Sequence, residues 1–264
     1  MVTYKKNNTD GKTKKYTCYL LLRKIKKKIV FNLIKYLSLQ KKDVYHFLVL
    51  DKNKKIILFL KKNKKKIIKD NFKLFEKKVN KYEFDWLLNL WSPLIFKKDF
   101  LNKFKSNLNL HPSYLPYNRG KDPYVWSILN EKPFGTTIHE MNEKIDDGNY
   151  YVRKKFKLKF PLKGFDLYEK SLVETKKLFI QNWLKIKNQK IKPKPYEKKT
   201  KLNVRENLKK INLINLNDKK NIEIKRFILR VLSQNFPTFK QQVKFKSKIF
   251  DIEVILKKNK KNKF

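Results

Sequence analysis

Hydrophobic residues near the start of the chain follow two different spacings. Residues 16–22 form a nearly continuous apolar run of strand length. Behind it, apolar side chains recur every three or four positions, as on one face of a helix; they are Ile25, Ile29, Leu33, Ile34 and Leu37. The pattern predicts a first strand and a helix after it, whereas the polar residues 1–15 are predicted to form a mobile tail.

The same alternation continues to about residue 110. Short apolar runs predict strands at residues 44–50, 67–68, 85–90 and 108–110. Helical segments are predicted in a lysine-rich stretch after residue 50 and at residues 97–104, and a further segment of unassigned type lies at residues 72–79. Because strands that alternate with helices build a parallel sheet, we predict a Rossmann-like α/β domain with a mostly parallel sheet. Its first strand runs into Arg23 and Lys24 and therefore lacks the glycine-rich turn of a dinucleotide site.

The second half of the chain has a different pattern. Strands are predicted at residues 136–141 and 150–158, and a helix at 166–185. A Lys-Pro-Lys-Pro sequence at 192–195 indicates a boundary, and a helix at 222–232 with strands at 241–245 and 249–256 follows it. We therefore expect a main domain at residues 16–190, a small C-terminal α/β domain at 196–256 and a lysine-rich tail at 257–264.

The charge of the chain changes this picture little. The formal net charge is +45, from 68 Lys and Arg against 23 Asp and Glu, which is typical of nucleic-acid partners. However, the lysines are scattered along the whole chain, and the sequence contains no alanine and only five glycines, as expected from AT-rich codons. No basic and aromatic module is visible, so we expect no specific nucleic-acid partner.

Cysteine and histidine are scarce. Cys18 is the only cysteine, which excludes an intrachain disulfide and fits a cytoplasmic location. No apolar run is long enough for a transmembrane helix, and no signal peptide is recognisable. His46 and His139 lie in apolar strand patterns and are predicted to be structural. With the histidines separated in sequence, we expect no metal site.

Residues 109–148 carry the candidate chemistry. This segment holds three of the five glycines and four of the nine prolines. A glycine kept in a glycine-poor chain usually marks a backbone conformation that a side chain would block. Asn109 and His111 lie at a strand end, where alternation directs both side chains to one face. Asp146 follows later in an Asp-Asp-Gly turn.

Four short motifs follow one another there. They are Asn-Leu-His-Pro-Ser at 109–113, Leu-Pro-Tyr-Asn-Arg-Gly at 115–120, Gly-Thr-Thr-Ile-His at 135–139 and Ile-Asp-Asp-Gly at 145–148. Their order and spacing resemble the folate-dependent formyltransferases, whose hallmark is Asn-x-His-Pro-Ser followed by an Asp-x-Gly loop. The resemblance implies transfer of a formyl group from 10-formyltetrahydrofolate to an amine.

The resemblance assigns catalytic roles to Asn109, His111 and Asp146. An amine that attacks the formyl carbon creates a tetrahedral intermediate with an oxyanion and an ammonium. His111 and the Asn109 amide are expected to hydrogen-bond the oxyanion, which is worth roughly 3 kcal/mol per donor. Asp146 is expected to orient or charge His111 and to help move the amine proton. Asp147 is expected to be a turn residue only.

The resemblance also implies a folate site beside the catalytic strand. Apolar side chains and loop backbone are expected to form one wall; the residues are Leu88, Leu90, Trp91, Ser92, Pro93 and Leu94. The loop at 142–147, beginning with Asn142, is expected to cover the other side. Ordinary core packing is the alternative for several of these residues.

Among these enzymes, those that N-formylate nucleotide-linked amino sugars are the most similar. They share the 115–120 phrase followed by Pro-Tyr-Val-Trp-Ser-Ile at 123–128, and they resemble residues 201–211 and 226–232. The glycinamide ribonucleotide enzymes carry a glycine-rich loop after the first strand and end sooner. The methionyl-tRNA enzymes are longer and usually have glycine where Pro112 stands. The resemblance thus implies an enzyme that makes a cell-surface glycan precursor, as in lipopolysaccharide biosynthesis.

A nucleotide diphosphate needs cations, and Arg119 with Lys121 is a candidate partial site. The alternative for Arg119 is a structural role in its loop. Tyr117 and Asn118 are expected to shape the sugar pocket. The family also implies a homodimer through the C-terminal strands. Two other functions stay open, namely formylation of methionyl-tRNA or another amine, and a nonenzymatic basic nucleic-acid-binding role.

Overall fold

The protein is described by a computed structural model. It describes residues 4–6, 14–21, 27–40, 43–49, 54–63, 66–69, 71–81, 84–92, 94–157, 163–197, 200–204, 206–207, 215–233, 242–245 and 247–255. The chain divides into two compact units, residues 1–205 and 206–264, and each is treated by itself. The first unit carries the candidate chemistry.

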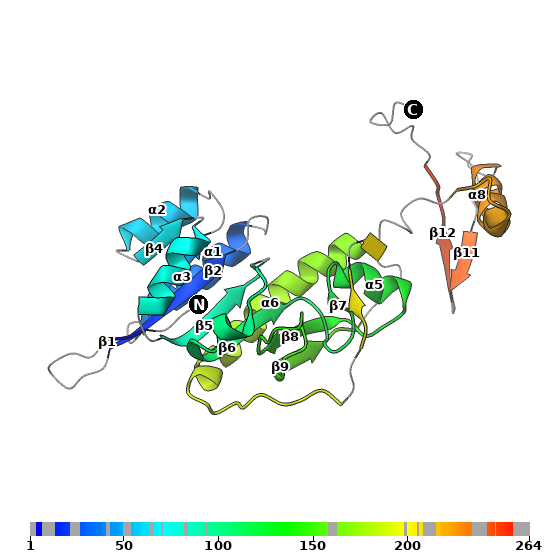
Figure 1. Ribbon diagram of the computed structural model, residues 1–264. Helices are drawn as coiled ribbons and strands as arrows, with labels where there is room; N and C mark the ends of the chain where they lie inside the picture. Colours follow the sequence, from blue (N-terminus) through cyan, green and yellow to red (C-terminus); the bar gives the residue numbers. More distant parts are fainter. Residues whose placement is uncertain are drawn as a thin grey trace. The chain divides into compact units, whose positions relative to one another are not determined.

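An eight-stranded sheet forms the centre of the first unit (Figure 1). Its strand order is β4-β3-β2-β1-β5-β6-β8-β9, and β2 also pairs directly with β5. The strands are β1 (Tyr4–Lys6), β2 (Lys14–Leu21), β3 (Asp43–Val49), β4 (Lys66–Lys69), β5 (Phe84–Leu90), β6 (Phe104–His111), β8 (Gly135–His139) and β9 (Tyr150–Lys155).

The central strands of this sheet are parallel. Parallel pairing joins β4 to β3, β3 to β2, β2 to β5 and β5 to β6, whereas β1, β8 and β9 pair antiparallel. The helices between the parallel strands are α1 (Lys27–Ser38), α2 (Lys54–Lys62), α3 (Phe72–Lys81) and α4 (Lys98–Leu101). The chain runs outward from β2 in one direction and then from β5 in the other, and ligands of open α/β sheets bind at such a reversal. The predicted Rossmann-like fold is confirmed.

Hydrophobic side chains cover both faces of the sheet. Along β3, Tyr45, Phe47 and Val49 belong to the cluster that also contains residues of α1, α2 and α6 (Gly164–Lys187), whereas Leu48 belongs to the cluster with residues of α3 and α4. The alternation follows from the two-residue period of a strand. Trp183 of α6 is fully buried, which anchors this long helix beneath the sheet.

Short strands are where the structure departs from the sequence patterns. β1 lies within the predicted tail, because backbone pairing with β2 and β5 does not require apolar side chains. The rest of that tail, apart from the start of β2, lies outside the described residues, as does the lysine-rich end at 257–264. β7 (Arg119–Gly120), β10 (Leu202–Asn203) and α5 (Pro123–Leu129) were not predicted.

The boundary between the units also lies later than residue 196. Lys194 pairs with Tyr150, and the ring of Tyr196 stacks on that of Tyr150 with centroids 5.3 Å apart. Leu202 and Asn203 pair with β7. The two prolines at 193 and 195 therefore lie inside the first unit, and the contacts place the division after residue 205.

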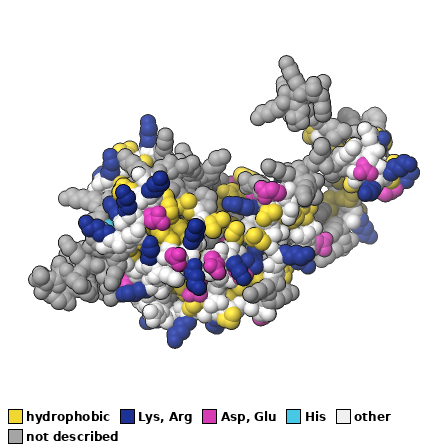
Figure 2. All heavy atoms as spheres, in the orientation of Figure 1, with side chains coloured by type: hydrophobic (Ala, Val, Ile, Leu, Met, Phe, Trp, Pro, Cys, Tyr) yellow, Lys and Arg dark blue, Asp and Glu magenta, His cyan; other side chains and the backbone are white. Residues whose placement is uncertain are grey.

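The second unit contains the predicted helix and hairpin. After the short η1 (Lys219–Asn221) come α8 (Ile222–Ser233) and the antiparallel strands β11 (Gln242–Phe245) and β12 (Lys248–Asp251). Within the described ranges of both units, no helix combines the length and the apolar character that crossing a bilayer requires. On the face shown in Figure 2, Lys and Arg side chains are spread among acidic and hydrophobic ones.

Candidate active site

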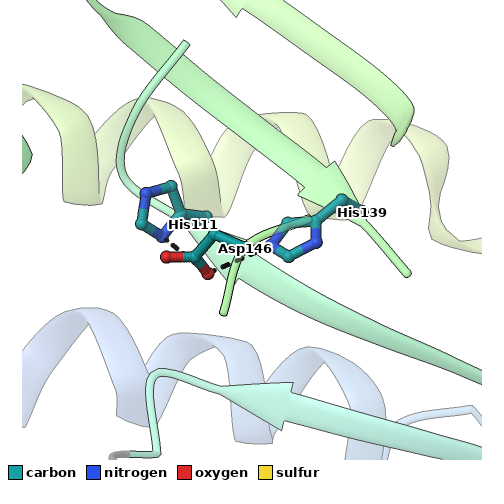
Figure 3. A group of neighbouring side chains, drawn as sticks. All are labelled: His111, His139 and Asp146. Atoms are coloured by element: carbon teal, nitrogen blue, oxygen red, sulfur yellow. Dashed lines mark ion pairs between the residues drawn. The ribbon is translucent and has the colours of Figure 1, made fainter. Parts of the chain in front are cut away.

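Two antiparallel strands bring the first three polar side chains together. In the pairing of β6 with β8, Asn109 lies opposite His139 and His111 lies opposite Thr137. Asn109 and His111 are two residues apart and share a face of the sheet. His139 therefore joins the predicted site, although the sequence patterns indicated a purely structural histidine (Figure 3).

Asp146 reaches this group from the loop after β8. The loop is closed by a hydrogen bond from Glu140 N to Asn149 O at 2.7 Å. A Cβ atom on Gly148 would lie 2.1 Å from Glu140 O, so the loop closes this tightly only with glycine. Asp146 itself has φ of 50°, in the left-handed region that aspartate tolerates better than most residues. The Asp-x-Gly motif is thus explained by the backbone of the loop, because position 146 has a positive φ and position 148 has no room for a side chain.

Replacing Gly148 with alanine is expected to lower the free energy of unfolding by about 1–3 kcal/mol, because backbone atoms must move to admit the methyl group. The matched control is Gly164→Ala, where the added Cβ would lie 3.6 Å from Tyr124 Cδ2, an ordinary contact at a helix start. That variant is expected to be neutral or slightly stabilised. Urea unfolding of both variants measures the difference, and equal stabilities would contradict the close approach at Gly148.

The Asp146 carboxylate links the loop to His111. His111 Nδ1 lies 3.4 Å from Asp146 Oδ1, and the side chains are 7% and 10% exposed. The backbone N–H of Gly120 donates to Asp146 Oδ2 at 3.0 Å. His111 Nε2 is buried and has no hydrogen-bond partner among the described residues. The ring thus has one nitrogen directed at a carboxylate and the other available to a ligand.

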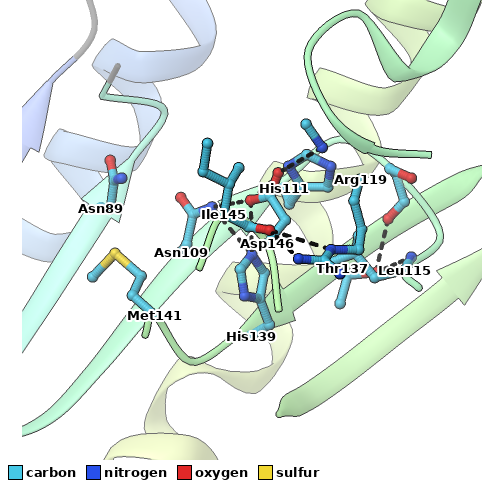
Figure 4. A network of polar contacts seen from close by, with 12 residues as sticks. Asn89, Asn109, His111, Leu115, Arg119, Thr137, His139, Met141, Ile145 and Asp146 are labelled. Carbon is cyan, nitrogen blue, oxygen red and sulfur yellow. Dashed lines mark hydrogen bonds and ion pairs between the residues drawn. The ribbon is translucent and has the colours of Figure 1, made fainter. Parts of the chain in front are cut away.

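The Asn109 amide lies between two acceptors (Figure 4). His139 Nδ1 lies 2.6 Å from the carbonyl oxygen of Glu140, so that nitrogen carries the proton and Nε2 is the acceptor. Asn109 Nδ2 lies 3.1 Å from this Nε2 and donates to Asp146 Oδ1 at 3.4 Å. The second of these bonds is long and therefore weak.

Burial and charge set the protonation of the pair. Burial lowers the pKa of His111, and the charge of Asp146 opposes this shift without cancelling it. Burial by itself raises the pKa of Asp146, but its polar contacts, led by His111, hold the pKa well below its usual range. At neutral pH the pair is therefore a carboxylate beside a neutral imidazole. With Nδ1–H directed at Asp146, His111 Nε2 is a proton acceptor.

Two of the three histidines lie close together with a carboxylate, although they are far apart in sequence, and the absence of a metal site stays a prediction. One ligand atom each of His111, His139 and Asp146 lies within 4.8 Å of the others. Separation along the chain did not reveal this, because the β6–β8 pairing joins residues about thirty positions apart. The contacts above already give these side chains hydrogen-bonding roles without an ion.

The residues predicted to bind the sugar nucleotide lie on the segment after β6. Asn118 is buried, and its Nδ2 has no hydrogen-bond partner in the described part of the chain. Tyr117 is half-buried and Lys121 is exposed, and the charge of Lys121 lowers the pKa of His111. The guanidinium of Arg119 points to the Asp146 loop, where it forms an ion pair with Asp147.

The residues predicted to bind folate fall into two groups. Leu88 and Leu90 have no exposed surface and pack in the core with α1 and α6, so core packing holds for these two. Ser92 and Leu94 are partly exposed beyond the end of β5, where Ser92 N donates to Asn89 Oδ1. Trp91 is 5% exposed, and Pro93 lies outside the described residues.

Asn142 lies in the loop that carries Asp146. It is exposed, and its Oδ1 accepts a hydrogen bond from Lys144 N at 3.0 Å. Its predicted contact with folate stays a prediction.

Residues 13–182 match the sequence model of the family described as Formyl transferase. The chain belongs to the formyl transferase family. The matched region contains the whole Asn109, His111, His139 and Asp146 group. In this family member, the four side chains therefore come from the paired strands β6 and β8 and from the loop after β8.

This formyl transferase is similar to proteins of three kinds of organism. The methionyl-tRNA formyltransferase of Borreliella afzelii is 45% identical over 75 residues, which are 28% of this chain and 24% of that enzyme. A sugar N-formyltransferase from a Shewanella species has a TM-score of 0.62 at 23% identity, covering 92% of this chain and 99% of that one. An N-formyltransferase from Helicobacter canadensis, in complex with folinic acid and dTDP-3-aminofucose, has a TM-score of 0.57 at 22% identity, covering 77% and 73%. The structural likenesses show a shared fold.

Proposed function

We propose that this formyl transferase moves a formyl group from 10-formyltetrahydrofolate to the primary amine of a nucleotide-linked amino sugar. The observation that carries the proposal is the buried His111, whose Nδ1 faces the Asp146 carboxylate and whose Nε2 has no partner among the described residues. A buried nitrogen without a partner costs free energy unless a ligand satisfies it. It is therefore a natural place for the reacting amine.

His111 moves the proton in this proposal. As the amine nitrogen bonds to the formyl carbon, Nε2 of His111 accepts a proton from that nitrogen. The imidazolium that forms is stabilised by Asp146, 3.4 Å from Nδ1. Nε2–H then returns the proton to the departing nitrogen as the old carbon–nitrogen bond breaks. Acid–base transfer of this kind contributes about 100- to 10,000-fold to a rate.

Asn109 stabilises the oxyanion. One of its amide hydrogens is held by His139 at 3.1 Å, and the other makes the long contact to Asp146 at 3.4 Å. The weakly held hydrogen is the one that turns to the formyl oxygen as negative charge develops there. His139 then acts through Asn109, because its acceptor nitrogen fixes the side of the amide that carries the hydrogens.

The folate supplies an activated formyl carbon when bound. The donor set suits that chemistry, since a hydrogen-bond donor and a proton acceptor lie side by side in a buried group. The complex of the Helicobacter protein with folinic acid supports a folate donor. Ser92 and Leu94, partly exposed beyond the end of β5, are the residues we assign to the folate wall.

A sugar nucleotide is the favoured acceptor, because the structural match covers nearly the whole length of a sugar N-formyltransferase. The fold match reaches 99% of the Shewanella sugar enzyme, and the Helicobacter protein holds dTDP-3-aminofucose. The buried Asn118 Nδ2, which has no hydrogen-bond partner in the described part of the chain, suits a sugar hydroxyl. We place the enzyme in the cytoplasm, in the synthesis of a cell-surface glycan precursor such as a lipopolysaccharide sugar.

Methionyl-tRNA is the second candidate acceptor. The identity of 45% to the Borreliella enzyme over 75 residues and the net charge of +45 favour it. The aligned segment is 24% of that enzyme, however, and the charge is not gathered on the face in Figure 2.

Incubation with 10-formyltetrahydrofolate and a panel of nucleotide-linked amino sugars tests the function. We expect the mass of one sugar nucleotide to increase by one formyl group. Initiator methionyl-tRNA is tested in parallel, and transfer to it alone would replace the sugar assignment by the second candidate. Transfer to neither acceptor would contradict the proposed function.

Assembly through the second unit is part of the same proposal. α8 exposes four apolar side chains, with Ile222 and Leu229 on one side of the helix and Ile224 and Phe227 on the opposite side. Exposed apolar side chains of this number on a small unit support a homodimer. Light scattering of the purified protein decides between one and two copies.

A further inference from the structure

Asp146 depends on its surroundings for its position. Its backbone lies in the left-handed region, and its carboxylate takes a hydrogen bond from the N–H of Gly120, the second residue of β7. The distance between the carboxylate and His111 is therefore set by how β7 sits against the loop. A side chain that links β7 to this loop would therefore control the distance between the Asp146 carboxylate and His111.

Arg119 joins β7 to both neighbours of Asp146, and Figure 4 shows it beside Ile145. On one side, its Nε and Nη2 donate to the carbonyl oxygen of Ile145 at 3.2 and 2.8 Å. On the other side, its Nη1 lies 2.8 Å from Asp147 Oδ1. The two side chains of the ion pair are only 11% and 12% exposed. A planar guanidinium can hold several acceptors in fixed directions, which a lysine ammonium cannot do in the same way.

The segment at residues 200–203, which contains Thr200 and β10, also contacts Arg119 and β7. Thr200 O accepts from Arg119 Nη1 at 3.1 Å, and Thr200 Oγ1 donates to Pro116 O. β10 runs parallel to β7, and Asn203 O accepts from Lys121 N at 3.0 Å. A Cβ atom on Gly120 would lie 2.2 Å from Asn203 O, so this approach requires glycine. β7 is thus held by β10 as well as by the loop.

We propose that Arg119 and Asp147 are positioning residues that hold the Asp146 carboxylate against His111. This inference rests on the proposed function and assigns Arg119 to the loop rather than to the diphosphate. Four of the five guanidinium N–H directions are already engaged by Ile145, Thr200 and Asp147, which leaves one Nη2–H for any ligand. Asp147 then has a role beyond the turn.

Two conservative variants test the pair. Asp147→Asn keeps the shape but weakens the ion pair, and Arg119→Lys keeps the charge but loses the planar fork. Each is expected to lower kcat about 10- to 100-fold with the KM for the sugar nucleotide unchanged within about twofold, because small misplacements of catalytic groups have effects of this size. In the double variant the loss should not exceed that of the more affected single variant, because the two residues act as one unit.

A second readout needs no substrate. NMR titration of His111 in the purified proteins reports the distance of the Asp146 charge, which raises the pKa of His111 against the lowering by burial. If Asp146 moves away, the titration of His111 shifts to lower pH in both variants. The control is Glu174→Gln, which breaks contacts with Lys154 and Lys177 of similar length away from the site and is expected to leave kcat and the titration unchanged.

The outcomes separate the two proposals. A diphosphate-binding Arg119 would raise the KM for the sugar nucleotide in Arg119→Lys and leave Asp147→Asn like the wild type, which would overturn the positioning role. An unchanged His111 titration in Asp147→Asn would overturn it as well. If the wild type formylates no acceptor, the proposed function fails, and the titration still decides whether the pair positions Asp146.

Discussion

Replacing His111 with alanine is expected to lower kcat for formyl transfer by about 1,000-fold or more. Two contributions disappear together, namely proton transfer at Nε2 and the interaction of the imidazolium with Asp146, and the first alone is worth about 100- to 10,000-fold. The KM for the sugar nucleotide should change much less, because the His111 ring contacts the reacting atoms and not the rest of the sugar nucleotide. Single-turnover formylation with purified enzyme measures the loss.

The fold of this variant has to be checked separately, because His111 is 6% exposed. His111→Gln fills most of the same space without an acid–base group and should be as inactive as the alanine variant. Thermal unfolding close to that of the wild type shows that both are folded. A kcat within about tenfold of the wild type in both variants would contradict the proton-transfer role of His111.

Replacing Asp146 with asparagine is expected to lower kcat about 100- to 10,000-fold and to change its pH dependence. The Asp146 charge raises the pKa of His111 against the lowering by burial, so its removal lowers that pKa further. Activity that requires neutral His111 is lost as pH falls through the pKa of His111. In the wild type this acid limb should lie below the ordinary value of 6.5, and in Asp146→Asn it should lie lower still.

Asp146→Asn is a fair test because asparagine, like aspartate, tolerates a positive φ, and φ of Asp146 is 50°. The rate of formyl transfer is measured from pH 4 to 9 with wild type and variant. NMR titration of His111 in both proteins gives the same pKa change without the substrate. A shift of the acid limb to higher pH would show that Asp146 does not act on His111 as a negative charge.

Local patterns predicted most of the elements that build the sheet. The alternation of apolar runs and helical spacing placed β3, β5 and α6 within a few residues of their ends. The predicted helix at 97–104 is shorter, at Lys98–Leu101, because residue 104 already belongs to β6. Strands of two or three residues escaped prediction, since β1, β7 and β10 are defined by their pairing partners.

The sequence by itself determined the α/β class, the motifs around Asn109, His111 and Asp146, and the glycines that the tight loop requires. These features follow from periodicity and from backbone conformations that single residues impose. Only the tertiary structure decided that His139 joins the group and that Arg119 and Asp147 enclose Asp146. Those contacts depend on the register of β6 with β8 and on the pairing of β7 with β10, which join positions far apart in the chain.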